Sequence, residues 1–320
     1  LAYFGSTQGA AITSAQIKTL DATDILALGV DAITALSPAA IAAIPSAAFA
    51  NITTAAFALF TPAQVAAMTP AQLSQMANPS GSNGQTVAFG PDQAAALTSK
   101  QVVKIVAADA VSFTSDAIPA IKAAAIGSLD LSSFTSTEVA YLTATQAPAI
   151  TSKQIAALDD SADTSGLTAD FVAALTPTAF KGFTGTNAGA KTQGIPSLTT
   201  DAVAVITTAQ LAALTTTQVE SFTQTQVNNF SADVLTVLAN KGYTTITTSA
   251  GTKSGIETST VIAGDSTTAA TYTAGKKAIA FTNSNAGIAD TITGSSLADT
   301  ISYMGADSIT SGAGNDSITS

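Results

Sequence analysis

The segment from Ile206 to Phe230, ITTAQLAALTTTQVESFTQTQVNNF, places an apolar residue followed by Ser or Thr at every eighth position: 206, 214, 222 and 230. An amphipathic helix repeats every 3.6 residues and a strand every two, so a period of eight fits neither as one continuous element. The period extends, with a few interruptions, over most of residues 12–238. Over this range the sequence therefore predicts a repeat architecture.

In many of the octapeptides a Thr and a Gln stand three residues apart, as do Thr207 and Gln210. This is the spacing of a capping box, in which the Thr hydroxyl and the Gln side chain each satisfy a backbone N–H at the start of a helix. Proline gives independent support because it directly follows the Ser or Thr at the first helical position, where a missing N–H costs nothing. These prolines are Pro38, Pro62, Pro70 and Pro177. Each octapeptide is thus predicted to form one short helix.

A helix this short is unstable alone, because its nucleation is unfavourable and few hydrogen bonds follow. We therefore expect residues 1–240 to form a solenoid of short capped helices that bury a common apolar stripe. Residues 241–287 lack the capping spacing and contain β-branched runs such as TSTVIAG and KKAIAFT, which indicate strands. The expected fold class is α + β in separate domains, with a boundary near residue 240.

From Ile288 the chain reads IADTITGSSLADTISYMGADSITSGAGNDSITS, in which each Asp is followed two residues later by Ile. These aspartates are spaced by nine, eight and nine residues. The pattern resembles the RTX nonapeptide, Gly-Gly-x-Gly-x-Asp-x-apolar-x, the haemolysin-type calcium-binding repeat of proteins exported by bacterial type I secretion. The resemblance implies a β-roll beginning in residues 288–320, with Gly supplying tight turns and Asp supplying oxygen ligands.

The match is closest at residues 311–319, where only the first Gly of the motif is replaced, by Ser311. All candidate ligands are oxygens and the chain has no His or Cys, which favours Ca²⁺ over Zn²⁺. The alternative is a Gly- and Asp-rich array of turns that binds no metal. The candidate calcium-site residues are Asp290, Asp299, Gly305, Asp307, Gly312, Gly314 and Asp316.

In a β-roll, loops two repeats apart lie on the same side, so the resemblance implies that Asp299 pairs with Asp316 and Asp290 with Asp307. The first pair is expected to bind calcium better, because the loop before Asp316 is richer in Gly. The step between Asp299 and Asp307 is eight residues instead of nine, so a distorted turn that spoils a site is expected here if anywhere.

The composition excludes several classes of function. Only 10% of residues are charged, every cation is Lys, and the formal charge is -10, which disfavours binding to nucleic acid. No apolar stretch is long enough to span a membrane. Without His or Cys the chain lacks the commonest catalytic groups, so we expect no enzyme activity and no catalytic residues. Asp159 and Asp160 are interpreted as a polar link between octapeptide blocks.

The low charge, the abundance of Ala, Thr and Ser, and the C-terminal repeats resemble the surface-layer and adhesin members of the RTX group. This resemblance implies an extracellular, secreted structural protein that assembles on the bacterial cell surface with Ca²⁺. Two alternatives stay open. The chain is the non-catalytic front part of a secreted RTX enzyme or toxin, or it is an anchor whose Thr/Gln face contacts cell-surface polysaccharide.

Overall fold

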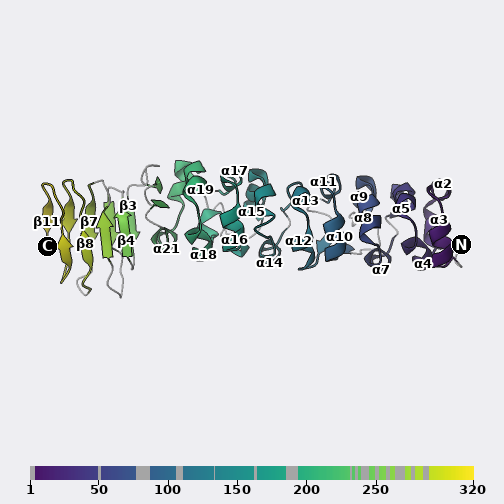
Figure 1. The fold of residues 1–320 in the computed structure, drawn as a ribbon, viewed down its shortest axis with the longest axis horizontal. Coiled ribbons are helices and arrows are strands. Elements are labelled where there is room, and N and C mark those ends of the chain that lie inside the picture. Colours follow the sequence, from purple (N-terminus) through teal and green to yellow (C-terminus); the bar gives the residue numbers. More distant parts are fainter. Residues whose placement is uncertain are drawn as a thin grey trace. The chain divides into compact units, whose positions relative to one another are not determined.

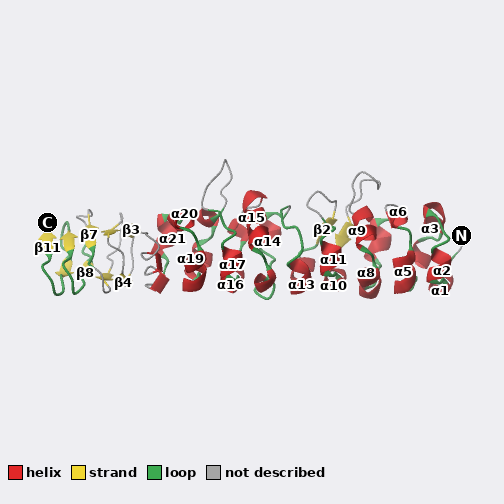
Figure 2. Cartoon of the chain, turned by 90° about the horizontal axis from the view of Figure 1, so that it is seen from above, coloured by secondary structure: helices red, strands yellow, loops and turns green. Residues whose placement is uncertain are grey.

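The computed structural model describes residues 4–49, 52–76, 87–105, 111–132, 134–161, 164–184, 194–230, 233–234, 237–238, 245–248, 252–256, 260–263, 271–274, 278–283 and 288–320. The chain divides into two compact units, Leu1–Ala162 (unit 1) and Asp163–Ser320 (unit 2). Short helices dominate unit 1 and the first part of unit 2, and parallel strands form the C-terminal part of unit 2 (Figure 1, Figure 2). The predicted order of helices followed by strands is confirmed, whereas the boundary predicted near residue 240 lies outside the described residues.

Unit 1 contains mostly helices of four to seven residues, together with two short strands. Its elements are α1 (Ser6–Ala11), α2 (Ser14–Ile17), α3 (Ala22–Ala27), α4 (Val30–Thr34), α5 (Pro38–Ala43), α6 (Ser46–Phe49), α7 (Thr54–Ala58), α8 (Pro62–Ala67), α9 (Pro70–Met76), β1 (Val87–Phe89), α10 (Pro91–Ala96), α11 (Ser99–Val102), β2 (Val111–Phe113), α12 (Ala117–Ala120), α13 (Ala123–Ile126), α14 (Ser136–Val139), the 3-10 helix η1 (Ala147–Ala149) and α15 (Ser152–Ser161).

Unit 2 begins with the same kind of helix and then changes to strands. Its helices are η2 (Thr164–Gly166), α16 (Ala169–Ala174), α17 (Pro177–Phe180), η3 (Ile195–Ser197), α18 (Thr200–Ala204), α19 (Thr208–Ala213), α20 (Thr216–Glu220) and α21 (Gln224–Asn228). Its strands are β3 (Thr245–Thr248), β4 (Thr252–Ile256), β5 (Thr260–Ala263), β6 (Thr271–Ala274), β7 (Ala280–Asn283), β8 (Thr291–Thr293), β9 (Thr300–Ser302), β10 (Ser308–Thr310) and β11 (Ser317–Thr319). No helix in the described part of the chain combines the length and apolarity that crossing a bilayer requires.

The predicted capping boxes are present. Thr207 Oγ1 accepts the backbone N–H of Gln210 at 3.2 Å, and Gln210 Oε1 accepts the backbone N–H of Thr207 at 2.8 Å. The same reciprocal pair begins α20 and α21. Pro38, Pro62 and Pro177 occupy the start of their helices, as the sequence predicts. One octapeptide therefore forms one capped helix.

Helices pack against the helix three elements further along the chain rather than against the next one. In unit 1, α1 packs on α4, α2 on α5, α3 on α6, and so on to α6 on α9. The stacked helices α2 and α5 begin at Ser14 and Pro38, three octapeptides apart in the sequence. In most of the described octapeptides both apolar residues lie in the core, as Leu211 and Leu214 do in unit 2, whereas Ile12, Leu20 and Phe113 are only partly buried. Three octapeptides thus form one structural repeat.

The capping glutamines also join one helix to an earlier one. Gln210 Nε2 donates to the carbonyl oxygens of Val172 at 2.7 Å and Leu175 at 2.8 Å, which lie at the C-terminal end of α16. The side chain therefore bonds groups of both kinds, the N–H at one helix start and two C=O groups at another helix end, of which Val172 also accepts the N–H of Leu175 at 3.3 Å. The same double role is filled by Gln64, Gln72, Gln93, Gln101, Gln146, Gln154, Gln218 and Gln226.

This arrangement reduces the surface available to a polysaccharide anchor. Gln210, Gln72 and Gln226 are each at most 2% exposed, so glutamine does not form an exposed Thr/Gln face at these positions. The sequence shows the cap at the start of each helix, but it does not show that the amide nitrogen turns inward. The inward turn has a physical reason, since a buried amide needs both carbonyl acceptors.

Two further features of unit 1 differ from the octapeptide pattern. Strands β1 and β2 pair in parallel with Phe89 opposite Phe113, and their rings stack with centroids 5.5 Å apart. The first apolar residue of an octapeptide can therefore sit in a strand as well as beside a cap. Asp159 and Asp160, interpreted from sequence as a polar link, lie instead within α15, because no Pro or Gly stops this helix after Leu158.

The strands of unit 2 form two parallel sheets, and consecutive strands alternate between them. One sheet has the order β10-β8-β6-β4 and the other β11-β9-β7-β5-β3. Each strand therefore pairs with the strand two positions earlier in the chain. Ser317 lies opposite Thr300, and Thr300 lies opposite Ala280. The strands predicted in TSTVIAG and KKAIAFT are confirmed as β5 and β7.

The central residue of several of these strands points into a small apolar core. This core consists of Tyr272, Ile279, Phe281, Ile292 and Ile301, each at most 2% exposed. Along β8 and β9 the flanking Thr and Ser are more exposed than the central Ile, as the alternation of a strand requires. The core thus fixes the direction of β8 and β9 and the position of the Asp before each of them.

Candidate functional site

Each of the four candidate aspartates lies directly before a strand: Asp290 before β8, Asp299 before β9, Asp307 before β10 and Asp316 before β11. Because Ile292 and Ile301, two positions after Asp290 and Asp299, are buried in the core, these two aspartates are held at the edge where the chain leaves one sheet and enters the other. Asp307 and Asp316 pair with them through the register of β10 with β8 and of β11 with β9. The regular Asp-x-Ile spacing therefore brings the carboxylates into register along two stacks.

The structure brings together the same two pairs that the sequence resemblance implies. The backbone N–H of Asp299 donates to Asp316 Oδ1 at 3.0 Å, and that of Asp290 donates to Asp307 Oδ1 at 2.9 Å. In return, the N–H after each later Asp donates to the carbonyl of the earlier one, at 2.8 Å for Asp299 and 2.7 Å for Asp290. Each carboxylate thus joins two turns that lie two repeats apart.

The carboxylate of Asp299 is 1% exposed and accepts hydrogen bonds from three groups. Its Oδ1 accepts from the backbone N–H of Ile279 at 2.8 Å and from Ser295 Oγ at 2.9 Å. Its Oδ2 accepts from the backbone N–H of Ser295 at 2.6 Å. A buried carboxylate requires such donors to compensate for lost hydration. Protein groups therefore already surround this oxygen pair.

Asp290 and Asp307 share a single amide. Asn283 Nδ2 donates to Asp290 Oδ2 at 3.1 Å and to Asp307 Oδ2 at 2.7 Å. Asn283 is 1% exposed and Asp290 is 5% exposed. Two carboxylates, one buried and one partly exposed, thus converge on the same buried amide.

The glycines adopt the backbone conformation that the motif requires. Gly305, Gly312 and Gly314 have φ of 92°, 90° and 133°, a region that other residues rarely enter. A Cβ on Gly312 would collide with the carbonyl oxygen of Ser295, and one on Gly314 would lie 2.6 Å from the Leu297 carbonyl oxygen. Gly312 and Gly314 therefore allow their turn to lie directly on the turn that contains Ser295 and Leu297.

The two pairs differ in how they fit a calcium ion. At Asp299 an ion would have to displace Ser295 and Ile279 from the carboxylate, so the residues present do not fit it there. At Asp290 and Asp307 two carboxylates converge with the Asn283 amide, a set of oxygen atoms of the kind that a hard cation prefers. Within the described residues, no three His, Cys, Asp or Glu side chains gather closely enough to hold a metal by themselves.

Comparison with known proteins adds no assignment. No family profile matches the sequence, and no curated protein resembles it significantly.

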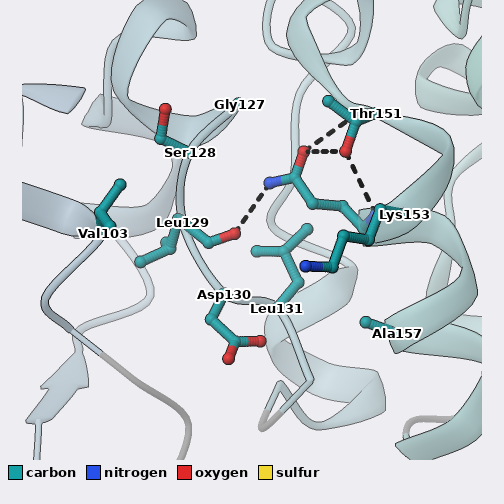
Figure 3. A pocket seen from close by; sticks show the side chains of 10 residues that line it. Val103, Gly127, Ser128, Leu129, Asp130, Leu131, Thr151, Lys153 and Ala157 are labelled. Atoms are coloured by element: carbon teal, nitrogen blue, oxygen red, sulfur yellow. Dashed lines mark hydrogen bonds between the residues drawn. The ribbon is translucent and has the colours of Figure 1, made fainter. Parts of the chain in front are cut away.

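Unit 1 contains a pocket of about 250 Å³ where the octapeptide period is interrupted between Leu129 and Phe134 (Figure 3). Gln154 forms one wall, because its Nε2 donates to the Leu129 carbonyl at 2.8 Å. Asp130, Lys153 and several apolar side chains complete the lining. Asp130 Oδ1 accepts the backbone N–H of Ser132 at 2.9 Å, which identifies this carboxylate as part of a local turn.

Sequence reasoning missed Ser295 and Asn283, the two side chains that complete the aspartate turns. Ser295 stands at the second Gly position of the motif preceding Asp299, so its departure from Gly is the signal that was available. Asn283 lies at the end of β7, outside any motif, and only the stacking of the sheets brings it to Asp290.

Proposed function

We propose that this chain is a structural subunit of an extracellular bacterial surface layer or adhesin, which assembles with copies of itself. In this proposal the octapeptide helices form a solenoid and the C-terminal strands form the beginning of an RTX-like β-roll. The proposal includes secretion by the type I route and a non-catalytic role. The return of the chain every three octapeptides and the alternation of strands between two parallel sheets support this architecture.

One observation carries the proposal: the polar groups of each repeat are satisfied by a later repeat. Gln210 donates hydrogen bonds to the carbonyl oxygens at the end of α16, and the Asp316 carboxylate accepts the backbone N–H of Asp299. A molecule stabilised in this way is extended by adding units, and its outermost units present unlike faces that can join head to tail. The chain also has few like charges to keep copies apart.

We further propose that calcium contributes at the pair formed by Asp290 and Asp307, together with Asn283. These residues would hold the ion, which would supply positive charge where two carboxylates converge. The ion would thereby favour the folded strands over the unfolded chain, because only the folded chain brings these groups together.

Electron microscopy of the purified chain tests assembly. We expect ordered sheets or filaments in calcium chloride and their loss in EDTA. Ile318→Lys should reduce assembly, because Ile318 is 47% exposed on β11, the outermost described strand of its sheet, and an edge lysine opposes strand pairing. Leu59→Lys is the matched control, since Leu59 is 60% exposed but lies among the helices of unit 1. A monodisperse monomer under both conditions would refute the proposal.

A further inference from the structure

The turn from Gly294 to Asp299 differs chemically from the motif it resembles. Ser295 replaces the second Gly and Leu297 replaces the Gly at the fourth position. The equivalent turn two repeats later has Gly312 and Gly314, both at positive φ, whereas no residue other than Gly has positive φ in the described chain. The two turns on this side therefore cannot present the same backbone oxygens.

The hydroxyl of Ser295 is fixed in direction by two neighbours. The backbone N–H of Leu297 donates to Ser295 Oγ at 3.0 Å, so the serine oxygen acts as an acceptor on that side. The hydroxyl hydrogen is then directed to Asp299, whose Oδ1 and Oδ2 lie 2.9 and 3.1 Å from Ser295 Oγ. Ser295 is 5% exposed, so water does not compete freely for this bond.

With the N–H groups of Ile279 and Ser295, this hydroxyl occupies most of the acceptor positions of the carboxylate. Hydrogen bonds from fixed donors compensate a buried carboxylate for its lost hydration, as a bound cation would. The hydroxyl of Ser295 and the two N–H groups thus supply the donors that a bound metal would otherwise replace at this carboxylate.

We infer that Ser295 takes the place of calcium beside Asp299, and that the turn from Gly294 to Asp299 folds without metal. Asp299 then connects the turns before three neighbouring strands of one sheet, β7, β9 and β11. Its carboxylate accepts hydrogen bonds from the N–H of Ile279 and from Ser295 in its own turn, and its backbone N–H donates to Asp316. The inference is independent of the calcium proposed at Asp290 and Asp307, which lie on the other side.

Amide hydrogen exchange on the whole chain, measured in EDTA and in saturating calcium chloride, tests this inference. We expect the amides of Ile279, Ser295 and Asp299 to be equally protected under both conditions. Ser295→Ala should accelerate exchange at Ile279 at least about tenfold, because the carboxylate loses a donor and moves more freely. Calcium should not restore the protection. Ser296→Ala is the control, since Ser296 is exposed and adjacent, and it should leave exchange unchanged.

Two results would overturn the inference. The first is protection of these three amides that appears only with calcium in the unmodified chain. The second is restoration of the Ser295→Ala variant by calcium, which would show that an ion can occupy the position directly. If Ser295→Ala fails to fold, the unmodified chain alone decides: protection of the Ile279, Ser295 and Asp299 amides that requires calcium contradicts metal-independent folding, and equal protection in EDTA supports it.

Discussion

Gln210→Glu separates the two roles of the capping glutamines. The new side chain keeps an oxygen for the backbone N–H of Thr207, so the cap remains. It loses the nitrogen that donates to the carbonyls of Val172 and Leu175, and it directs an oxygen at both. Gln210 is 1% exposed, so water cannot replace the lost donor. The Val172 carbonyl keeps the backbone N–H of Leu175 at 3.3 Å, whereas the Leu175 carbonyl loses its donor. Leaving one buried acceptor unsatisfied predicts a loss of about 1 to 3 kcal/mol.

The matched control is Gln16→Glu. Gln16 forms the same capping box with Thr13, but it is exposed, and no inter-helix bond from its nitrogen exists among the described residues. A carboxylate there keeps the cap and lies near the positive end of a helix, so its effect on stability should be within about 1 kcal/mol. Urea unfolding followed by circular dichroism measures both variants. Equal midpoints for Gln210→Glu and Gln16→Glu would refute the inter-helix role.

The cost of Gln210→Glu should also depend on pH. Burial beside two carbonyl oxygens raises the pKa of the introduced carboxyl above its value of about 4.3 in the unfolded chain. The folded variant then binds a proton more tightly than the unfolded one, so its stability deficit shrinks as pH falls through the raised pKa and grows as pH rises. The difference in midpoint from the unmodified chain should therefore be smaller in mildly acidic buffer than at neutral pH, whereas that of Gln16→Glu should change little.

Three further tests, two of them with a paired control substitution, address the strand region. Gly312→Ala should destabilise it by about 2 kcal/mol or more, because φ is 90° and the added methyl meets the Ser295 carbonyl; loss of strand signal on mild heating would show this. Ile301→Ala should cost about 2 to 5 kcal/mol because Ile301 is fully buried, whereas Ile318→Ala, at a residue 47% exposed, should cost about 0.5 kcal/mol or less in the same urea titration. Asp307→Asn should abolish any rise in melting temperature on adding calcium, while Asp299→Asn should leave that rise in place; the reverse order would contradict the proposed location of the ion.

Local chemistry made part of this structure predictable. A Thr and a Gln three residues apart specify a helix start whatever lies beyond, and Asp-x-Ile specifies a strand with its Asp at the edge. The partners of Gln210 Nε2 were not predictable, because they depend on the chain returning every third octapeptide, and a period of eight does not by itself state how many octapeptides complete one circuit. Strands β1 and β2 were missed for a related reason, since Phe89 and Phe113 satisfy the octapeptide pattern equally well in a strand.

The aspartate turns show a second limit of motif reading. A motif predicts where a carboxylate lies, and here both Asp pairs lie where the resemblance implied. Which group neutralises the carboxylate depends on the residues that vary within the motif. Ser295 provides a hydroxyl where the motif has Gly, and Asn283 provides an amide from an earlier strand. Because a hydroxyl, an amide and a cation can each complement the same carboxylate, neighbouring repeats of one motif can differ in their need for metal. Each turn must therefore be assigned from its own donors.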